Sequence, residues 1–211
     1  MDKPIRVVSP TGVGQYTWLT EADTRFDSDG HFKTNLIITT DEAQPLVNEI
    51  KRALKQAQQI ASERMKKGQK VKWAPEPFFA EVDDAGNSTG NTIFKFKTKA
   101  QIVSKDGKVI ENRVPIFDSK GQPLKDTQVW SGSELKCSAD LIPYYTAVVG
   151  AGVSLRLRAV QVIKLVEGSG GSAQGFGFAE VKDGYEAPAT DESFTEELET
   201  DAEEEANIAD F

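Results

Sequence analysis

The fold assignment rests on the segment TIFKFKTKAQIV, residues 92–103. From Phe94 to Ile102, apolar residues and one threonine alternate with lysines and one glutamine. Successive side chains of a strand point to opposite faces, so this alternation predicts a strand with two unlike faces. One face would carry Phe94, Phe96, Thr98, Ala100 and Ile102, and the other Lys95, Lys97, Lys99 and Gln101. We expect the first face to be core and the second to be cationic.

Strand and turn signals continue on both sides of this segment. Asp106-Gly107 is a strong short-hairpin signal that returns the chain as a strand over 109–117, and Gly121 with Pro123 marks another turn. The last strands are expected over 135–141 and 151–166. Near the start, strands over 16–19 and 31–39 would form a hairpin across the turn-rich segment 27–30.

One helix is expected between these strands. Its apolar stripe has the spacing of an amphipathic helix and comprises Leu46, Val47, Ile50, Leu54, Ala57, Ala61 and Met65. Pro45 suits the first turn and Gly68 the C-cap. After it, Pro75 and Pro77 predict a loop over 69–90 without regular structure, with a long exposed turn over 83–91.

Many short strands with one early helix indicate a mainly β protein. The predicted fold is a small Greek-key barrel of the oligonucleotide-binding (OB) class, capped by one long helix. Residues 1–166 would form this domain, 167–185 a flexible Gly-rich linker, and 186–211 an acidic tail too poor in apolar residues to fold alone.

The charge is divided between body and tail. The net charge of −8 combines a body, residues 1–166, of 24 basic and 19 acidic residues with a segment, residues 167–211, of one lysine and 14 acidic residues. A polyanion would be attracted by the first and repelled by the second. This asymmetry indicates a nucleic-acid or membrane partner, and no apolar run approaches the length of a membrane span.

No catalytic or metal-binding constellation is recognisable. His31 is the single histidine and suits a strand end, and Cys137, the single cysteine, alternates with apolar neighbours as a buried small hydrophobe would. Asp83 and Asp84 match no calcium loop, and the glycines of 168–177 precede no helix that would cradle a phosphate. We therefore predict a protein that is not an enzyme and needs no cofactor.

Binding of a single strand needs cations along the phosphates and flat side chains beneath unpaired bases, and the chain supplies both. The candidate cations are Lys95, Lys97, Lys99, Arg156 and Arg158, with Lys33, Lys66, Lys67, Lys70 and Lys72 adding charge nearby. Any one stripe is equally compatible with a solvated outer face, but their coincidence in a basic body favours binding.

The aromatic candidates divide into two groups. Tyr144 and Tyr145 follow Pro143 where strand alternation breaks, so we place them in a loop between the last strands, where rings meet bases. Trp73, Phe78 and Trp130 fit stacking and packing equally well.

Several segments resemble the single-stranded DNA-binding proteins of T-seven-like bacteriophages. They are PFF (77–79), FKFK (94–97), FDSKGQPL (117–124), LIPYYTAVVGAGVSLRLRAV (141–160) and the closing ADF (209–211). The resemblance implies an OB barrel that coats single strands at a phage replication fork and promotes annealing. It also implies that Tyr144 contacts DNA, that Phe211 with Asp210 anchors DNA polymerase and helicase/primase, and that the protein forms a homodimer.

The function predicted from the sequence is therefore sequence-independent binding of single-stranded DNA in phage replication and recombination, in the cytoplasm of an infected bacterial host. The acidic tail would modulate DNA binding and recruit replisome proteins. Two alternatives remain open: an adaptor or DNA mimic that acts through its tail, and an RNA-binding OB module, because the sequence holds no visible test for the 2′-hydroxyl.

Overall fold

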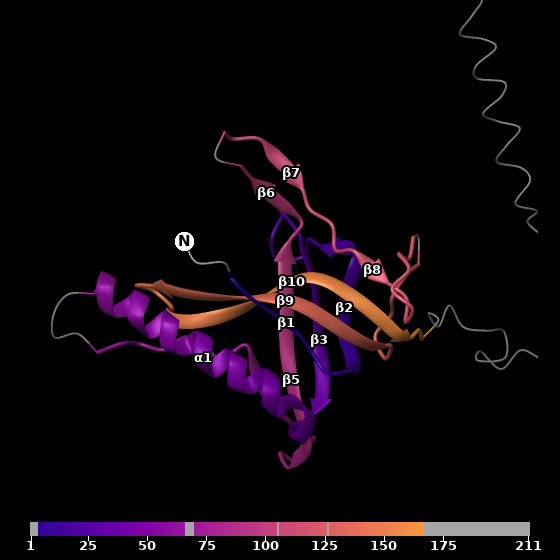
Figure 1. Ribbon diagram of the computed structural model, residues 1–211, viewed down its shortest axis with the longest axis horizontal. Helices are drawn as coiled ribbons and strands as arrows, with labels where there is room; N and C mark the ends of the chain where they lie inside the picture. Colours follow the sequence, from indigo (N-terminus) through magenta and orange to yellow (C-terminus); the bar gives the residue numbers. More distant parts are fainter. Residues whose placement is uncertain (1–3, 66–69, 105, 126, 167–211) are drawn as a thin grey trace, which may run out of the picture. The chain divides into compact units, whose positions relative to one another are not determined.

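The computed structural model describes residues 4–65, 70–104, 106–125 and 127–166, and within them the chain is mainly β with one helix (Figure 1). The predicted linker and tail, with Phe211 and Asp210, lie outside the described residues, as do Lys66, Lys67 and Gly68. In chain order the elements are β1 (Ile5–Val8), β2 (Gly12–Asp23), β3 (His31–Thr39), α1 (Thr40–Arg64), β4 (Phe78–Val82), β5 (Ser88–Lys99), β6 (Gln101–Val103), β7 (Val109–Glu111), β8 (Ile116–Phe117), β9 (Glu134–Thr146) and β10 (Gly150–Lys164).

Five of these strands close a ring. β2 pairs with β3, β3 with β5, β5 with β10, β10 with β9, and β9 returns to β2; only the β5–β10 pairing is parallel. Three strands attach outside the ring: β1 to β9, β4 to β5 and β8 to β10. The ring encloses a core whose largest fully buried side chains include Phe94, Phe96 and Leu36.

The alternation of buried and exposed side chains predicted for residues 92–103 is confirmed over most of the segment. In β5, Phe94 and Phe96 are buried while Lys95, Lys97 and Lys99 are exposed. The prediction fails beyond Lys99, because the strand breaks at Ala100, whose N–H donates to the Gly30 carbonyl and whose carbonyl accepts from Asn112. The chain then leaves the ring as the separate β6–β7 hairpin, which extends away from the other strands in Figure 1. Ile102 is consequently exposed rather than core.

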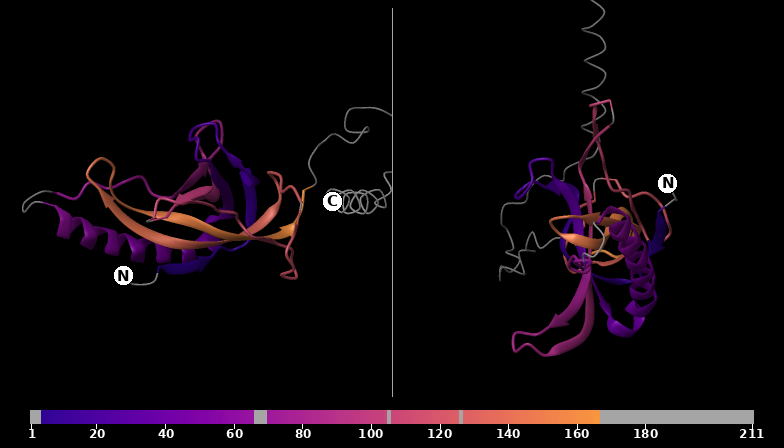
Figure 2. Two further views of the ribbon diagram at one scale, coloured as in Figure 1. Left: turned by 90° about the horizontal axis from the view of Figure 1, so that it is seen from above. Right: turned by 90° about the vertical axis from the view of Figure 1, so that its left-hand side faces the viewer.

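The helix is confirmed, with different ends. α1 buries the predicted stripe against β9 and β10, and it lies alongside the β9–β10 hairpin in Figures 1 and 2. It begins at Thr40, so Pro45 lies inside the helix instead of in its first turn; the acids Asp41 and Glu42 occupy that turn and favour its positive end. It ends at Arg64 with Met65 extended, so Gly68 is not its C-cap.

The loop predicted over 69–90 is wrong in its second half. Phe78–Val82 forms β4, which pairs antiparallel with β5, and the predicted exposed turn shrinks to a short connection between Val82 and Ser88. Pro77 does not prevent this strand because it precedes it, and its carbonyl accepts from the Lys95 N–H. The strand expected over 109–117 is likewise divided into β7 and β8, with Pro115 directly before β8.

Candidate nucleic-acid interface

Three basic side chains line up across three neighbouring strands on the outer face of the ring. Lys33 of β3 is the register partner of Lys97 of β5, and Lys97 is the register partner of Arg156 of β10. Adjacent strands lie about 4.8 Å apart, so the row crosses the sheet at close spacing. We call Lys33, Lys97 and Arg156 the basic row. Local sequence could not reveal it, because its members come from widely separated segments.

The predicted stripes extend the row along the strands. Lys95 and Lys99 flank Lys97 on β5, and Arg158 follows Arg156 on the same face of β10. Both strands contribute to the lining of a cavity of about 420 Å³, which includes Lys97, Lys99, Arg156, Arg158 and His31. Four permanent cations around one open cavity form a site suited to anionic oxygen atoms.

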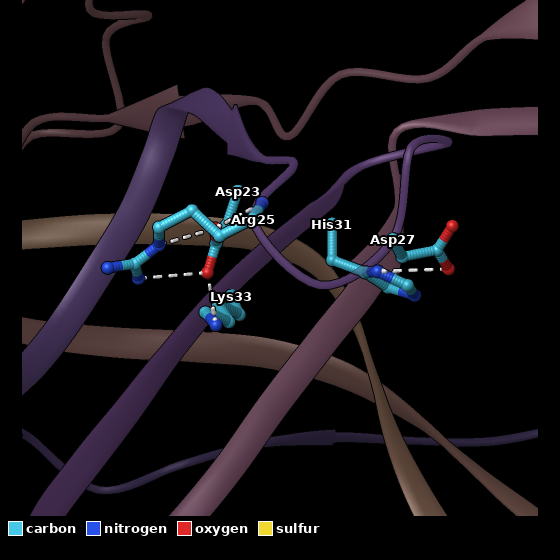
Figure 3. Close-up of polar contacts among 5 residues, drawn as sticks. All are labelled: Asp23, Arg25, Asp27, His31 and Lys33. Carbon is cyan, nitrogen blue, oxygen red and sulfur yellow. Dashed lines mark hydrogen bonds and ion pairs between the residues drawn. The ribbon is translucent and has the colours of Figure 1, made fainter.

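Two buried carboxylates hold the cations at the borders of this face. Asp23, at the end of β2, accepts hydrogen bonds from Arg25 at 2.9 and 3.1 Å and pairs with Lys33 (Figure 3). On the other side, Asp140 of β9 accepts from Arg6 at 2.9 Å and lies 3.5 Å from Arg158. Each acid therefore fixes two cations.

The ion pairs also shift the pKa values of the groups that form them. The hydrogen bond from Arg25, and after it that from Lys33, holds the pKa of Asp23 far below its usual range. The same contact raises the pKa of Arg25, and Asp140 likewise raises the pKa of Arg6. Asp23 is thus a carboxylate at any ordinary pH. Away from this face, complete burial raises the pKa of the Cys137 thiol, consistent with the packing role predicted for it.

Exposed aromatic rings that the sequence analysis missed border the basic row. Tyr16 is 66 % and Phe26 88 % exposed, and the Arg25 guanidinium lies 4.7 Å from the centre of the Trp18 ring. On the other flank, Phe79 of β4 lies under the Lys95 ammonium at 4.8 Å. Trp18 shares a face with the row because it is the register partner of Lys33, and the Phe26 ring lies 5.8 Å from the Lys33 ammonium.

Tyr144 and Tyr145 are not in a loop, as predicted, but within β9. Pro143 is tolerated there because, among the described residues, β10 is the one strand that pairs with β9 at this point, so no hydrogen bond from Pro143 is needed on the other side. Tyr144 pairs with Gly152 and is half-buried, with its hydroxyl 2.8 Å from where a Cβ on Gly152 would lie. Two-residue periodicity places Gly152 on the same face of β10 as Arg156, so Tyr144 borders the basic face.

Tyr145 points to the opposite face. It packs against Ala57 and Ala61 of α1 and against Ala151. The strand alternation that places Tyr144 at the basic face places Tyr145 toward the helix, so Tyr145 lies apart from the basic row.

The remaining aromatic candidates separate by burial. Phe78 is half-buried and packs on Phe94 at a ring distance of 5.6 Å, so packing accounts for it. Trp73 is 48 % exposed beside β10, where it bridges to Ala151, and Trp130 is 47 % exposed in the loop before β9.

Two further predicted cations stand apart from the row. Lys72 donates to the Val148 carbonyl at 2.9 Å, and Lys70 is exposed; no contact joins either to the basic row within the described residues.

Within the described parts of the chain, no three His, Cys, Asp or Glu side chains are placed to hold a metal ion. No helix there is long and apolar enough to cross a membrane.

The profile of a known family, described as the single-stranded DNA-binding protein of bacteriophage T7, matches residues 12–165. The chain belongs to this family. Among solved structures, the single-stranded DNA-binding protein encoded by bacteriophage T7 matches with a TM-score of 0.68 and 26 % identity, over 88 % of this chain and all of that one.

A second phage protein shares the fold. The single-stranded DNA-binding protein of bacteriophage Enc34, solved in complex with single-stranded DNA, matches with a TM-score of 0.55 and 13 % identity, over 78 % of this chain and 89 % of that one. No curated protein sequence matches the chain. The resemblance that the segments at 77–79, 94–97, 117–124 and 141–160 indicated is thus confirmed at the level of the family.

Proposed function

We propose that this member of the phage family is a sequence-independent binder of single-stranded DNA, that it is not an enzyme, and that its DNA path follows the basic row. The observation that carries the proposal is the alignment of Lys33, Lys97 and Arg156 across β3, β5 and β10. Phosphates would meet these cations, and bases would stack on the bordering rings. Stacking accepts any base, so such a path has no strict sequence requirement.

We also assign the ring to the OB class. Its closed order of five strands, with the parallel β5–β10 pairing, supports this assignment. OB barrels bind oligonucleotides on the face of their second and third strands, which in this ring are β3 and β5. The basic row crosses that face.

From its membership of the family, we propose that the protein acts in replication and recombination, promotes annealing, and works with the polymerase and the helicase/primase. We also propose that it forms a homodimer, that it acts inside an infected host, and that Phe211 with Asp210 forms the anchor for these partners.

Loss of Phe211 alone should abolish docking to the polymerase while leaving affinity for DNA unchanged.

Titration of tryptophan fluorescence tests the central function. Oligo-dT, a duplex of equal length and an RNA strand are compared at one salt concentration. We expect oligo-dT to quench the fluorescence and to bind more tightly than the duplex. No binding of oligo-dT would refute the proposal in favour of an adaptor acting through its tail, and equal or tighter binding of RNA would favour the RNA-binding alternative.

Replacing Tyr144 with Ala should weaken binding of oligo-dT about tenfold, within the roughly 1 to 3 kcal/mol that one base stack contributes. The dependence of affinity on salt should stay nearly unchanged because no phosphate contact is lost. A variant that melts like the parent protein and binds equally well would remove Tyr144 from the DNA path.

Replacing Asp23 with Asn removes a negative charge next to the basic row, so long-range electrostatics alone would favour tighter binding. We expect weaker binding by roughly fivefold instead. The ion pairs already order the Arg25 and Lys33 side chains before DNA binds. Without them, binding itself would have to order these side chains, at a cost of about 0.5 to 1.5 kcal/mol for each.

Asp29→Asn is the matched control: it makes the same charge change near Lys99, but its carboxylate is half-exposed and lies 3.7 Å from that lysine. It should leave binding unchanged or slightly tighter.

Because the pKa of Asp23 is lowered in the folded state, the contribution of its ion pairs to folding stability is present above about pH 4. It is lost only as pH falls through that lowered pKa. Tighter binding by Asp23→Asn would show that the ion pairs do not position the cations.

A further inference from the structure

The backbone of β2 is irregular at Tyr16. Gln15 pairs with Asn35 and Trp18 with Lys33, so β2 advances three residues while β3 advances two. Tyr16 lies in this bulge with φ of 51°, and it is the one non-glycine residue with positive φ in the described ranges. A bulky side chain rarely adopts this conformation, which costs free energy and persists only where the surroundings impose it.

The bulge turns the Tyr16 ring outward. The ring is 66 % exposed, so burial of apolar surface does not repay the strained backbone. Bulges often redirect a side chain at a functional site. Here the redirected ring becomes one wall of a cavity of about 320 Å³.

The rest of that cavity suits a nucleotide. Among the described residues its lining contains four cations and no acid; the charged members are Arg25, Lys33, Lys95 and Lys97. Asn35 supplies an amide that both donates and accepts hydrogen bonds. Asp23 pairs with two of these cations, Arg25 and Lys33, and is not among the lining residues. The flat ring suits stacking of a base, the cations suit its phosphate, and the amide suits hydrogen bonds with the base edge. The volume of the cavity is at the lower end of the range for small-molecule sites.

We propose that this cavity is a single-nucleotide subsite of the DNA path, separate from Tyr144, in which a base stacks on Tyr16, its phosphate meets Lys33 and Lys97, and Asn35 hydrogen-bonds the base edge. The proposal rests on the proposed function and adds a fixed position on that path. The strained bulge presents the ring before DNA arrives, so binding does not have to order it.

Tyr16→Gly tests the subsite, because glycine adopts positive φ freely and the substitution removes the ring together with the strain. We expect the melting temperature of the full chain to stay the same or rise, while affinity for oligo-dT falls between about fivefold and 150-fold, the equivalent of one base stack. Tyr16→Phe, which keeps a ring at the same backbone position, should retain most of the affinity.

Other outcomes overturn the inference in distinguishable ways. A lower melting temperature for Tyr16→Gly would assign the residue a structural role. Unchanged affinity of Tyr16→Gly, with the parent protein still binding oligo-dT, would eliminate the subsite and leave the proposed function intact. Failure of the parent protein itself to bind would refute the proposed function. Asn35→Ala should narrow the difference in affinity between oligo-dA and oligo-dT, and an unchanged difference would remove Asn35 from the subsite.

Discussion

Reversing the charges of Lys97 and Arg156 together, to Glu, is expected to weaken binding of single-stranded DNA by at least about 25-fold at 0.1 M salt. Each phosphate contact on a single strand contributes about 0.7 to the slope of log affinity against log salt. Loss of two contacts should therefore lower that slope by about 1.4. Over the tenfold range of salt between 1 M and 0.1 M, this difference in slope corresponds to a loss of affinity of about 25-fold. The two introduced carboxylates add repulsion. All base compositions should be affected alike, because phosphates carry no sequence information.

The matched control reverses Lys51 and Lys55, which are exposed on α1. This variant has the same net charge as the double mutant in the basic row, so it measures the effect of total charge alone. Binding should fall much less than in the row variant, and the salt slope should stay close to that of the parent protein. Equal losses in the two variants would mean that Lys97 and Arg156 make no specific contact.

Deleting residues 186–211 is expected to tighten DNA binding at low salt by roughly 10- to 1000-fold. The segment has 11 acidic residues and no basic one, so we propose that it competes with DNA for the cations of the body. A tethered competitor acts at an effective concentration of about 1 mM, and weak non-specific binding to a polyanion has dissociation constants of roughly 10⁻⁴ to 10⁻⁶ M. The ratio of these quantities gives the expected factor. Screening should reduce it as salt rises.

A second variant keeps the length of the segment and replaces its acids with Gln and Asn. If charge is the cause, this neutral segment should give the same tightening as the deletion. Both variants should also bind duplex DNA more readily than the parent protein. An unchanged affinity of the neutral variant at low salt would contradict the competitor hypothesis.

Local periodicity predicted the faces of single elements well. The alternation at 92–99 gave the buried Phe94 and Phe96 and the exposed lysines, and the helical stripe gave the buried face of α1. Such patterns are local, so they can be read without knowing which strands are neighbours. The division of the chain into buried and cationic surfaces was predictable for the same reason.

The assembled site was not predictable in this way. The basic row depends on the register between β3, β5 and β10, which only the pairing of distant segments sets. Tyr16 faces the row because of one extra residue in β2, and nothing in the local sequence marks that bulge. Asp23 would be expected at the surface, yet two cations compensate its burial.

The misplaced tyrosines show a different limit. Proline usually interrupts strands, so the sequence around Pro143 favoured a loop; an edge position that needs no N–H removes the objection. Once the strand continues, alternation alone sends Tyr144 and Tyr145 to opposite faces. A loop prediction could not separate them.

A backbone ¹H–¹⁵N NMR titration of the full chain with a short oligo-dT tests whether DNA follows the basic row. If DNA follows the outer face of β3, β5 and β10, the largest chemical-shift changes will fall on the amides of Lys33, Lys97 and Arg156 and their strand neighbours, with little change at Lys55 on α1. Changes concentrated on α1 or on the β6–β7 hairpin, with the basic row unaffected, would contradict the account.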